Sequence, residues 1–210
     1  MKVTPFCYDT ISCNSFVVGE EGGPCVLIDC GSSGNGRLFS YISRHHSRLE
    51  GVLITHGHYD HIAALGEVPK GVPIFLANED FVCLSSPNFN ASRSLAEDLV
   101  LPEEVAPYPV EDEDEVALPD FAVKVIATPF HTEGSVCYLF PNDNLIFTGD
   151  TLFRYGYGRT DLPGGDERKL IPSLRKLAKL DPNLRLYCGH GPSSTLGQAL
   201  SNIGFNSAYL

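Results

Sequence analysis

Seven consecutive residues in the first third of the chain, Thr55 to His61, combine three histidines with an aspartate and read THGHYDH. The apolar run directly before them, residues 52–54, predicts a buried strand. The four ligand-type side chains of this motif would therefore follow the carboxyl end of a strand, where functional groups are commonly placed. They are His56, His58, Asp60 and His61. This feature constrains the fold strongly, because other strands must end beside it to complete a site.

The spacing within the motif indicates two metal ions. On an extended segment His56 and His58 can face the same point, while Asp60 and His61 lie further on and face a second point. Four ligand-type side chains exceed what one tetrahedral ion with an open catalytic position would use, so two adjacent cations are expected. A polar surface loop rich in histidine is the alternative. Three of the chain's seven histidines behind one buried strand favour the metal site.

Length and charge narrow the class of protein. The 210 residues are enough for one domain with a substantial core, and we expect residues 1–210 to form a single domain. A formal net charge of −11 argues against a nucleic-acid backbone or an anionic membrane as partner. A small molecule is the expected partner, and an anionic one would need a local positive patch. Nothing in the sequence indicates the oligomeric state.

Cysteine usage and the amino terminus indicate the compartment. The seven cysteines are an odd number without a CxxC pair, which favours buried reduced thiols over a disulfide framework. The first residues, MKVTPFCYDTISCNSF, contain no apolar signal-peptide core, and no run in the chain approaches the length of a membrane span. We therefore expect a cytoplasmic protein.

Further short apolar runs each precede a metal-type side chain. Such runs predict strands, and in an open α/β arrangement the strand ends gather on one edge. Their positions predict a site built from five strand ends. After the run before the motif, the runs are residues 25–28 before Asp29, 123–127 before His131, 145–147 before Asp150, and 184–188 before His190.

Between these runs the pattern predicts helices and one long loop. Apolar residues at helical spacing predict a helix over residues 35–47 and a helix-like segment over 78–84. A further helix is expected to begin near Pro172, with residues 166–171 as a separate turn, because proline is tolerated in a first helical turn. Residues 99–119 are rich in proline and acid, and their five consecutive acidic residues, 111–115, predict a solvated loop or turn, with a cation site as the weaker alternative.

The complete set of motifs resembles the metallo-β-lactamase superfamily. The HxHxDH core stands at residues 56–61, and the later single ligands stand in TPFHTEGS, TGDTLF and GHGPSSTLG. The resemblance covers about Asp29 to Leu196, which is nearly the whole chain. It implies an α/β fold, specifically a four-layer αββα sandwich, with the metals in a cleft at one edge.

The resemblance also implies a role for each residue. It assigns His56, His58 and His131 to a first metal and Asp60, His61 and His190 to a second, with Asp150 bridging. Asp29 would orient a ligand imidazole. Two divalent ions are expected, most simply zinc, with iron or manganese as alternatives. Phe130 stands where a glycine is common and is expected to narrow the mouth of the site.

Within the superfamily, TGDTLFRYGYGRTDLPGGD and GHGPSSTLG are most similar to the short hydroxyacylglutathione hydrolases, which are glyoxalase II-like. This implies a hydrolase that cleaves a thioester such as S-lactoylglutathione through a metal-bridging hydroxide, with Asp60 and Asp150 as catalytic residues that act as ligands. Longer members carry a C-terminal helical domain that binds glutathione. Only residues 191–210 follow the last ligand, so we expect that domain to be absent, which leaves glutathione specificity open.

The GYGRTD segment supplies candidates for substrate binding. Arg159 can hold a carboxylate with two parallel hydrogen bonds, and Tyr155 or Tyr157 could line the same cleft. A structural ion pair of Arg159 with Asp161 or Asp166 is an equally weighted alternative.

Three other functions were weighed. A persulfide dioxygenase of the same fold would hold one ferrous ion on His56, His131 and Asp150, and ligand identity alone does not exclude it. A nuclease is disfavoured by the acidic balance. A scaffold without catalysis would have no reason to keep seven ligand-type side chains.

Overall fold

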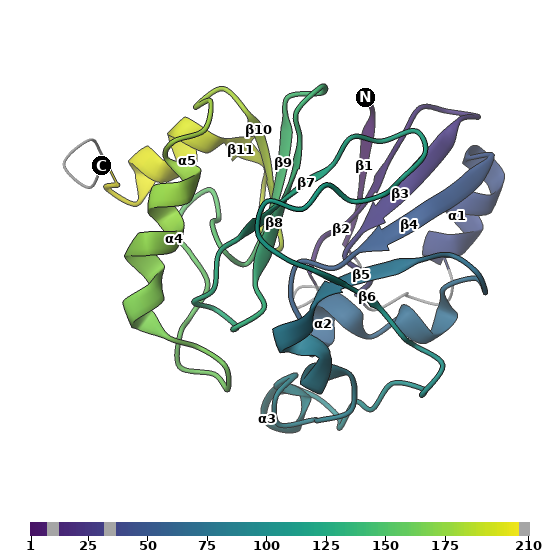
Figure 1. Ribbon diagram of the computed structural model, residues 1–210, viewed down its shortest axis with the longest axis horizontal. Coiled ribbons are helices and arrows are strands. Elements are labelled where there is room, and N and C mark those ends of the chain that lie inside the picture. The colour runs from purple at the N-terminus through teal and green to yellow at the C-terminus, as the bar shows by residue number, and fades with distance from the viewer. Residues whose placement is uncertain (8–12, 32–36, 206–210) are drawn as a thin grey trace.

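Two β-sheets packed face to face form the centre of the computed structural model, which describes residues 1–7, 13–31 and 37–205 (Figure 1). Helix α1 covers the outer face of one sheet, and helices α4 and α5 cover the outer face of the other (Figure 1). The predicted α/β class and αββα sandwich are therefore confirmed.

The first sheet has six strands in chain order, β1-β2-β3-β4-β5-β6. Its strands are β1 Val3–Phe6, β2 Ser15–Val18, β3 Pro24–Ile28, β4 Arg48–Leu53, β5 Ile74–Ala77 and β6 Tyr108–Val110. Strands β3, β4 and β5 are parallel, so their carboxyl ends lie at the same edge of the sheet.

The second sheet has five strands in the order β11-β10-β9-β8-β7. Its strands are β7 Lys124–Ala127, β8 Val136–Phe140, β9 Leu145–Gly149, β10 Arg185–Cys188 and β11 Ser194–Thr195. Strand β8 is antiparallel to both β7 and β9, while β9 and β10 are parallel. Strands β7, β9 and β10 consequently run in one direction and end at the same edge.

The described helices are short. The α-helices are α1 Arg37–His45, α2 Tyr59–Ile62, α3 Ser92–Leu95, α4 Leu170–Leu177 and α5 Leu196–Asn202, and the 3-10 helices are η1 Leu65–Glu67, η2 Asn78–Leu84 and η3 Glu167–Lys169. Among the described residues, no helix has both the length and the apolar character needed to cross a membrane.

Alternating side chains explain the layers. On β3, Val26 and Ile28 are fully buried in the core between the two sheets, whereas Leu27 packs with Leu38 of α1 on the outer face. Strand β9 follows the same rule, since Ile146 packs toward α4 and its neighbours in sequence face the inter-sheet core. Because a strand turns successive side chains to opposite faces, a central strand covered on both sides is apolar throughout.

Several predicted boundaries differ from the structure. The predicted helix over 35–47 corresponds to α1, which ends at His45 because β4 begins at Arg48, and the start of the predicted range lies outside the described residues. Helix α4 begins at Leu170, two residues before Pro172, directly after the 3-10 turn η3. Strands β8 and β11 and helix α5 were not predicted.

The region of residues 99–119, which is rich in proline and acid, contains a strand that was not predicted. Tyr108–Val110 forms strand β6 at the edge of the first sheet, where three residues are too few to show a sequence alternation. The acidic run after it is exposed, as expected, but it is tied to the second sheet. Asp112 accepts a hydrogen bond from the Ala127 amide at 2.7 Å and pairs with Lys176 at 2.7 Å.

Candidate metal centre

All seven side chains predicted as metal ligands gather where the carboxyl ends of strands from both sheets meet. The loop after β4 and helix α2 carry residues 56–61, while His131 follows β7, Asp150 follows β9 and His190 follows β10. The expected convergence of strand ends is therefore present. It is produced by two sheets that meet at one edge, and not by the single open sheet that the strand pattern suggested.

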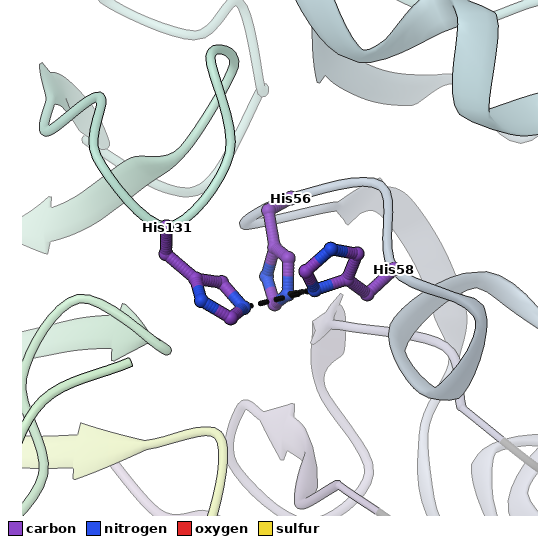
Figure 2. A group of neighbouring side chains, drawn as sticks. All are labelled: His56, His58 and His131. Carbon is purple, nitrogen blue, oxygen red and sulfur yellow. Dashed lines mark hydrogen bonds between the residues drawn. The ribbon is translucent and has the colours of Figure 1, made fainter. Parts of the chain in front are cut away.

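Three histidines form the first ligand group. In Figure 2 the rings of His56 and His58 extend from one loop and that of His131 from a loop on the opposite side, with their nitrogens directed at one another. His58 Nδ1 lies 3.2 Å from His56 Nε2 and 2.9 Å from His131 Nε2. All three residues are at most 4% exposed.

In His131 and His56, the hydrogen bond made by Nδ1, which points away from the group, determines whether Nε2, which faces the group, carries a lone pair. His131 Nδ1 donates a hydrogen bond to the Arg159 carbonyl at 2.7 Å, so its Nε2 carries a lone pair. His56 Nδ1 lies 3.2 Å from the hydroxyl of Thr55, which itself donates to Asp29, so His56 Nε2 also carries a lone pair. Lone pairs this close repel one another unless a cation lies between them, and three imidazoles fit a divalent metal.

A second ligand group adjoins the first. It contains Asp60, His61 and His190, and His190 Nε2 lies 3.2 Å from Asp60 Oδ2. Asp150 stands between the groups, because its Oδ1 is 3.4 Å from His61 Nε2 and its Oδ2 is 3.5 Å from both His131 Nε2 and His190 Nε2. Within the described residues, His61 Nε2 and Asp150 Oδ1 are buried and have no hydrogen-bond partner. A second cation would satisfy both atoms, so the residues present fit two metals.

The protonation states of His56, His58 and Asp150 suit cation binding. Burial, reinforced by the neighbouring imidazoles, lowers the pKa of His56 well below its usual value and that of His58 to about 3, so both rings are neutral at pH 7. Burial opposes ionisation of Asp150, but its contacts with His61 and the other histidines outweigh this and lower its pKa. Neutral imidazoles and an ionised carboxylate are the forms that bind metal.

Asp29 holds His61 in place. Its backbone φ of 55° is a conformation that aspartate tolerates better than most residues, and it directs the buried carboxylate at the loop after β4. Asp29 accepts hydrogen bonds from the Thr55 amide at 2.8 Å and from His61 Nδ1 at 2.9 Å. The proton on Nδ1 leaves Nε2 of His61 free for a cation. This geometry agrees with the orienting role that the sequence predicted.

A pocket of about 270 Å³ lies over the two ligand groups. Besides ligand residues, its walls are mainly apolar and include Tyr59, Leu95, Phe153 and Leu162. Arg159 also lines it, but the guanidinium makes two 2.6 Å hydrogen bonds to Asp161, both residues being exposed. The structural pair that the sequence left open for Arg159 is thus formed with Asp161.

The remaining sequence expectations concern aromatic residues. Tyr155 is 70% exposed, does not line this pocket, and lies beneath the guanidinium of Arg154, so its role in substrate binding stays a prediction. Tyr157 is also outside the pocket lining. Phe130 is fully buried in the core beneath α4. The expectation that Phe130 narrows the mouth is therefore wrong, because its side chain points into the protein.

Asp80 and Thr55 were overlooked in the sequence. Thr55 connects Asp29 to His56 as described above. Asp80 lies on η2, 2% exposed, and accepts hydrogen bonds from Gly57, Thr132 and Gly134. Burial raises its pKa and these hydrogen bonds oppose the rise. A carboxylate three residues after an apolar run, at the same edge as the ligands, was the available signal.

Comparison with known proteins gives a consistent family. The family described as "Metallo-beta-lactamase superfamily" matches residues 8–190. A probable metallo-hydrolase of Streptococcus pyogenes is 37% identical and spans 81% of this chain and 76% of its own. The hydroxyacylglutathione hydrolase GloC of Haemophilus influenzae is 33% identical and spans 88% of each chain.

Solved structures extend the similarity. A B3 metallo-beta-lactamase, BLEG-1, superposes with a TM-score of 0.89 at 28% identity and covers 98% of this chain and 100% of its own. A di-iron-bound protein, TTHA1623, gives 0.81 at 30% identity, with 97% and 100% covered. ETHE1 from Myxococcus xanthus gives 0.75 at 25% identity, with 97% and 83% covered.

Proposed function

The chain belongs to the metallo-β-lactamase superfamily, and from this premise we propose that it is a dinuclear metal-dependent hydrolase that cleaves a thioester such as S-lactoylglutathione. The cations are most simply zinc, with iron or manganese as alternatives. The ligands are the seven residues gathered at the sheet edge, and residues 1–210 act as one catalytic domain.

One observation carries this proposal. The second ligand group is as complete as the first, and Asp150 presents one oxygen to His61 and the other to His131 and His190. A mononuclear centre would need only one group. A buried polar atom without a hydrogen-bond partner lowers the stability of the folded protein. The presence of two such atoms side by side, His61 Nε2 and Asp150 Oδ1, favours a second cation that both would bind.

Two bound cations would supply an activated water near neutral pH and a Lewis acid for the substrate carbonyl. The chain's own residues hold that arrangement. Asp150 connects the two groups, Asp60 Oδ2 lies 3.2 Å from His190 Nε2 so that both could bind one cation, and Asp29 fixes the ring of His61. A thiolate leaves more readily than an amide nitrogen, so this chemistry requires no separate general acid.

The pocket defines where substrate would lie. Arg159 lines this pocket and bonds Asp161 through Nε and one terminal nitrogen, and its guanidinium has further N–H groups that could bind a substrate carboxylate. The apolar wall formed by Tyr59, Leu95 and Leu162 suits the less polar part of a thioester. The 33% identity to a hydroxyacylglutathione hydrolase along 88% of the chain supports a glutathione thioester as the first substrate to test.

A persulfide dioxygenase remains the second candidate, and the similarity to ETHE1 is the observation in its favour. Such an enzyme would use one ferrous ion on His56, His131 and Asp150, and His190 would have no part in it.

Metal analysis under defined oxygen separates the two candidates. Protein purified without added metal would be analysed for elemental content and assayed for S-lactoylglutathione hydrolysis under argon. About two metal ions per chain and oxygen-independent cleavage are expected. One iron per chain, no cleavage, and oxygen uptake with glutathione persulfide would replace the hydrolase with the dioxygenase.

A further inference from the structure

Asp80 is a buried carboxylate for which the described part of the chain shows no hydrogen bond or ion pair to the side chain of any of the seven predicted ligands. It lies on η2, directly after β5 of the first sheet, and is 2% exposed. Buried carboxylates are rare unless they are paired with a cation or fully hydrogen-bonded. No ion pair is found for Asp80 in the described part of the chain, so its hydrogen bonds must account for its burial.

These hydrogen bonds join the two histidine-bearing loops. Asp80 Oδ2 accepts from the Gly57 amide at 2.7 Å, and Gly57 lies between His56 and His58 on the loop of the first sheet. The same oxygen accepts from the Thr132 hydroxyl at 2.7 Å, and Oδ1 accepts from the Gly134 amide at 2.9 Å. Both of these residues follow His131 on the loop of the second sheet.

Both glycines allow a very close approach to Asp80. A Cβ atom at Gly134 would lie 2.6 Å from Asp80 Cγ, and one at Gly57 would lie 2.5 Å from the Cβ of Cys83, which is on the same 3-10 helix. Real Cβ atoms essentially never come this near to another atom. The backbones of the two loops are therefore pressed against η2 from opposite sheets, with the Asp80 carboxylate between them.

A hydroxyl network fixes the direction of the Thr132 bond. The Ser135 hydroxyl accepts from the Thr132 amide at 3.0 Å and lies 2.8 Å from the Thr132 hydroxyl. Thr132 donates its only hydroxyl proton to Asp80, so the proton between the two hydroxyl groups comes from Ser135, which donates to Thr132. Asp80 thus receives three donors and needs to be an acceptor at both oxygens.

We propose that Asp80 is a positioning residue for the three-histidine metal site: by clamping the loop of His56 and His58 to the loop of His131, it fixes the separation at which their nitrogens converge. The separation matters because His58 Nδ1 and His131 Nε2, which come from different sheets, are only 2.9 Å apart. This proposal rests on the metal centre of the proposed function and is independent of the substrate.

The substitution Asp80→Asn tests the clamp with almost no change in shape. An amide has one acceptor oxygen in place of two, and its NH₂ group would face a donor that it cannot satisfy. One loop is then released. We expect the metal affinity of the three-histidine site to fall about tenfold or more, as for other groups that support ligands from behind.

Two backgrounds show which site is affected. His190→Ala removes a ligand of the second group and leaves the three histidines of the first site in place. His58→Ala removes a ligand of the three-histidine site itself. Asp80→Asn is expected to weaken Co²⁺ binding in the first background, measured by titration of the visible absorption and by competition with a chelator. In the second background it is expected to leave the affinity of the remaining site unchanged within a factor of about two. Equal weakening in both backgrounds would indicate a general structural role and overturn the proposal.

Glu50→Gln is the matched control. Glu50 is also a buried carboxylate, with its side chain 1% exposed, but it accepts from Arg48 and from the Asp120 amide at the far end of β4. Its replacement is expected to lower stability without changing metal affinity. If Glu50→Gln weakens the three-histidine site as much as Asp80→Asn does, the clamp is rejected.

Thr132 provides a second test if Asp80→Asn does not fold. Thr132→Val removes one donor from the clamp and is expected to weaken the three-histidine site severalfold, whereas Thr132→Ser retains the hydroxyl and is expected to restore binding. Identical affinities for Val and Ser would overturn the proposal. Wild-type protein that binds no metal would instead overturn the proposed function.

Discussion

Asp150 occupies the position on which both ligand groups depend. Each of its carboxylate oxygens faces imidazole nitrogens at 3.4 to 3.5 Å, and those nitrogens belong to loops that follow three different strands. Asp29 acts on only one of these rings, through its 2.9 Å hydrogen bond with His61 Nδ1. The two aspartates should therefore differ in how severely their replacement affects the centre.

Replacing Asp150 by alanine is expected to abolish metal retention and thioester turnover together, because both ligand groups lose a shared oxygen ligand. Elemental analysis and an S-lactoylglutathione assay would measure the two effects. Asp143→Ala, which removes a carboxylate that pairs with the amino terminus at 3.3 Å, is the control and should retain both properties. An unchanged rate in the Asp150 variant would refute the ligand assignment.

Asp29→Asn is expected to weaken metal binding about tenfold without abolishing it. The amide can still accept from one donor, but it cannot accept from the Thr55 amide, the Thr55 hydroxyl and His61 Nδ1 at once. The orientation of the His61 ring is then less well defined. Calorimetric titration with Zn²⁺ would measure the loss, and an affinity equal to that of the unmodified protein would show that Asp29 does not orient His61.

At the scale of elements, short helices close the outer faces of the sandwich and depend on local caps. The side chain of Thr195 accepts a hydrogen bond from the Gln198 amide at 3.3 Å at the start of α5. The side chain of Asp166 caps η3 in the same way, through the Arg168 amide at 3.0 Å. Both caps lie away from the ligand residues in sequence, so they affect stability and not metal binding.

Thr195→Ala is expected to lower the free energy of unfolding by about 1 kcal/mol, because the first turn of α5 loses its side-chain acceptor. Denaturant unfolding at constant metal content would measure this as a lower midpoint with an unchanged slope. Thr195→Ser keeps the acceptor and should show nearly full stability. A midpoint identical for alanine and serine would mean that the cap contributes nothing.

At the scale of the whole molecule, polar contacts near the metal centre join the two sheets. The Val136 amide of β8 donates to the Thr55 carbonyl at 2.8 Å, and the Tyr138 hydroxyl donates to the Ile54 carbonyl at 3.0 Å. The ligand groups also combine residues from both sheets. Bound metals would therefore connect the two halves of the sandwich as well as perform chemistry.

Removal of the metals is expected to lower the unfolding temperature. A ligand present at a hundred times its dissociation constant stabilises the folded state by about 2.7 kcal/mol, and a chelator withdraws that contribution. Thermal unfolding with excess Zn²⁺ and after chelation would measure the difference. The Asp150→Ala variant should show almost none, and a wild-type protein equally insensitive would contradict metal binding at this centre.

Much of the architecture follows from local pattern. The apolar run at residues 25–28 predicts β3, because a central strand covered on both faces needs no polar alternation. The mainly apolar run at 184–188 predicts β10, in which Arg185 is exposed. Strand β6, at the edge of the first sheet, carries no such signal in three residues. Strand β8, which is largely buried, and helix α5, which buries Leu196, Ala199 and Leu200, were also not predicted.

The candidate ligand residues can be identified from the sequence itself, since histidine and aspartate placed directly after buried strands indicate metal chemistry whatever the details of packing. The resemblance to a family already implied two sheets and two ligand groups sharing Asp150, and only the tertiary structure decides that Asp80 joins their loops. The physical reason is distance along the chain. The donor and acceptor pairs that join Asp80 to Gly57 and to Gly134 lie 23 and 54 residues apart, and no local pattern records contacts of that range.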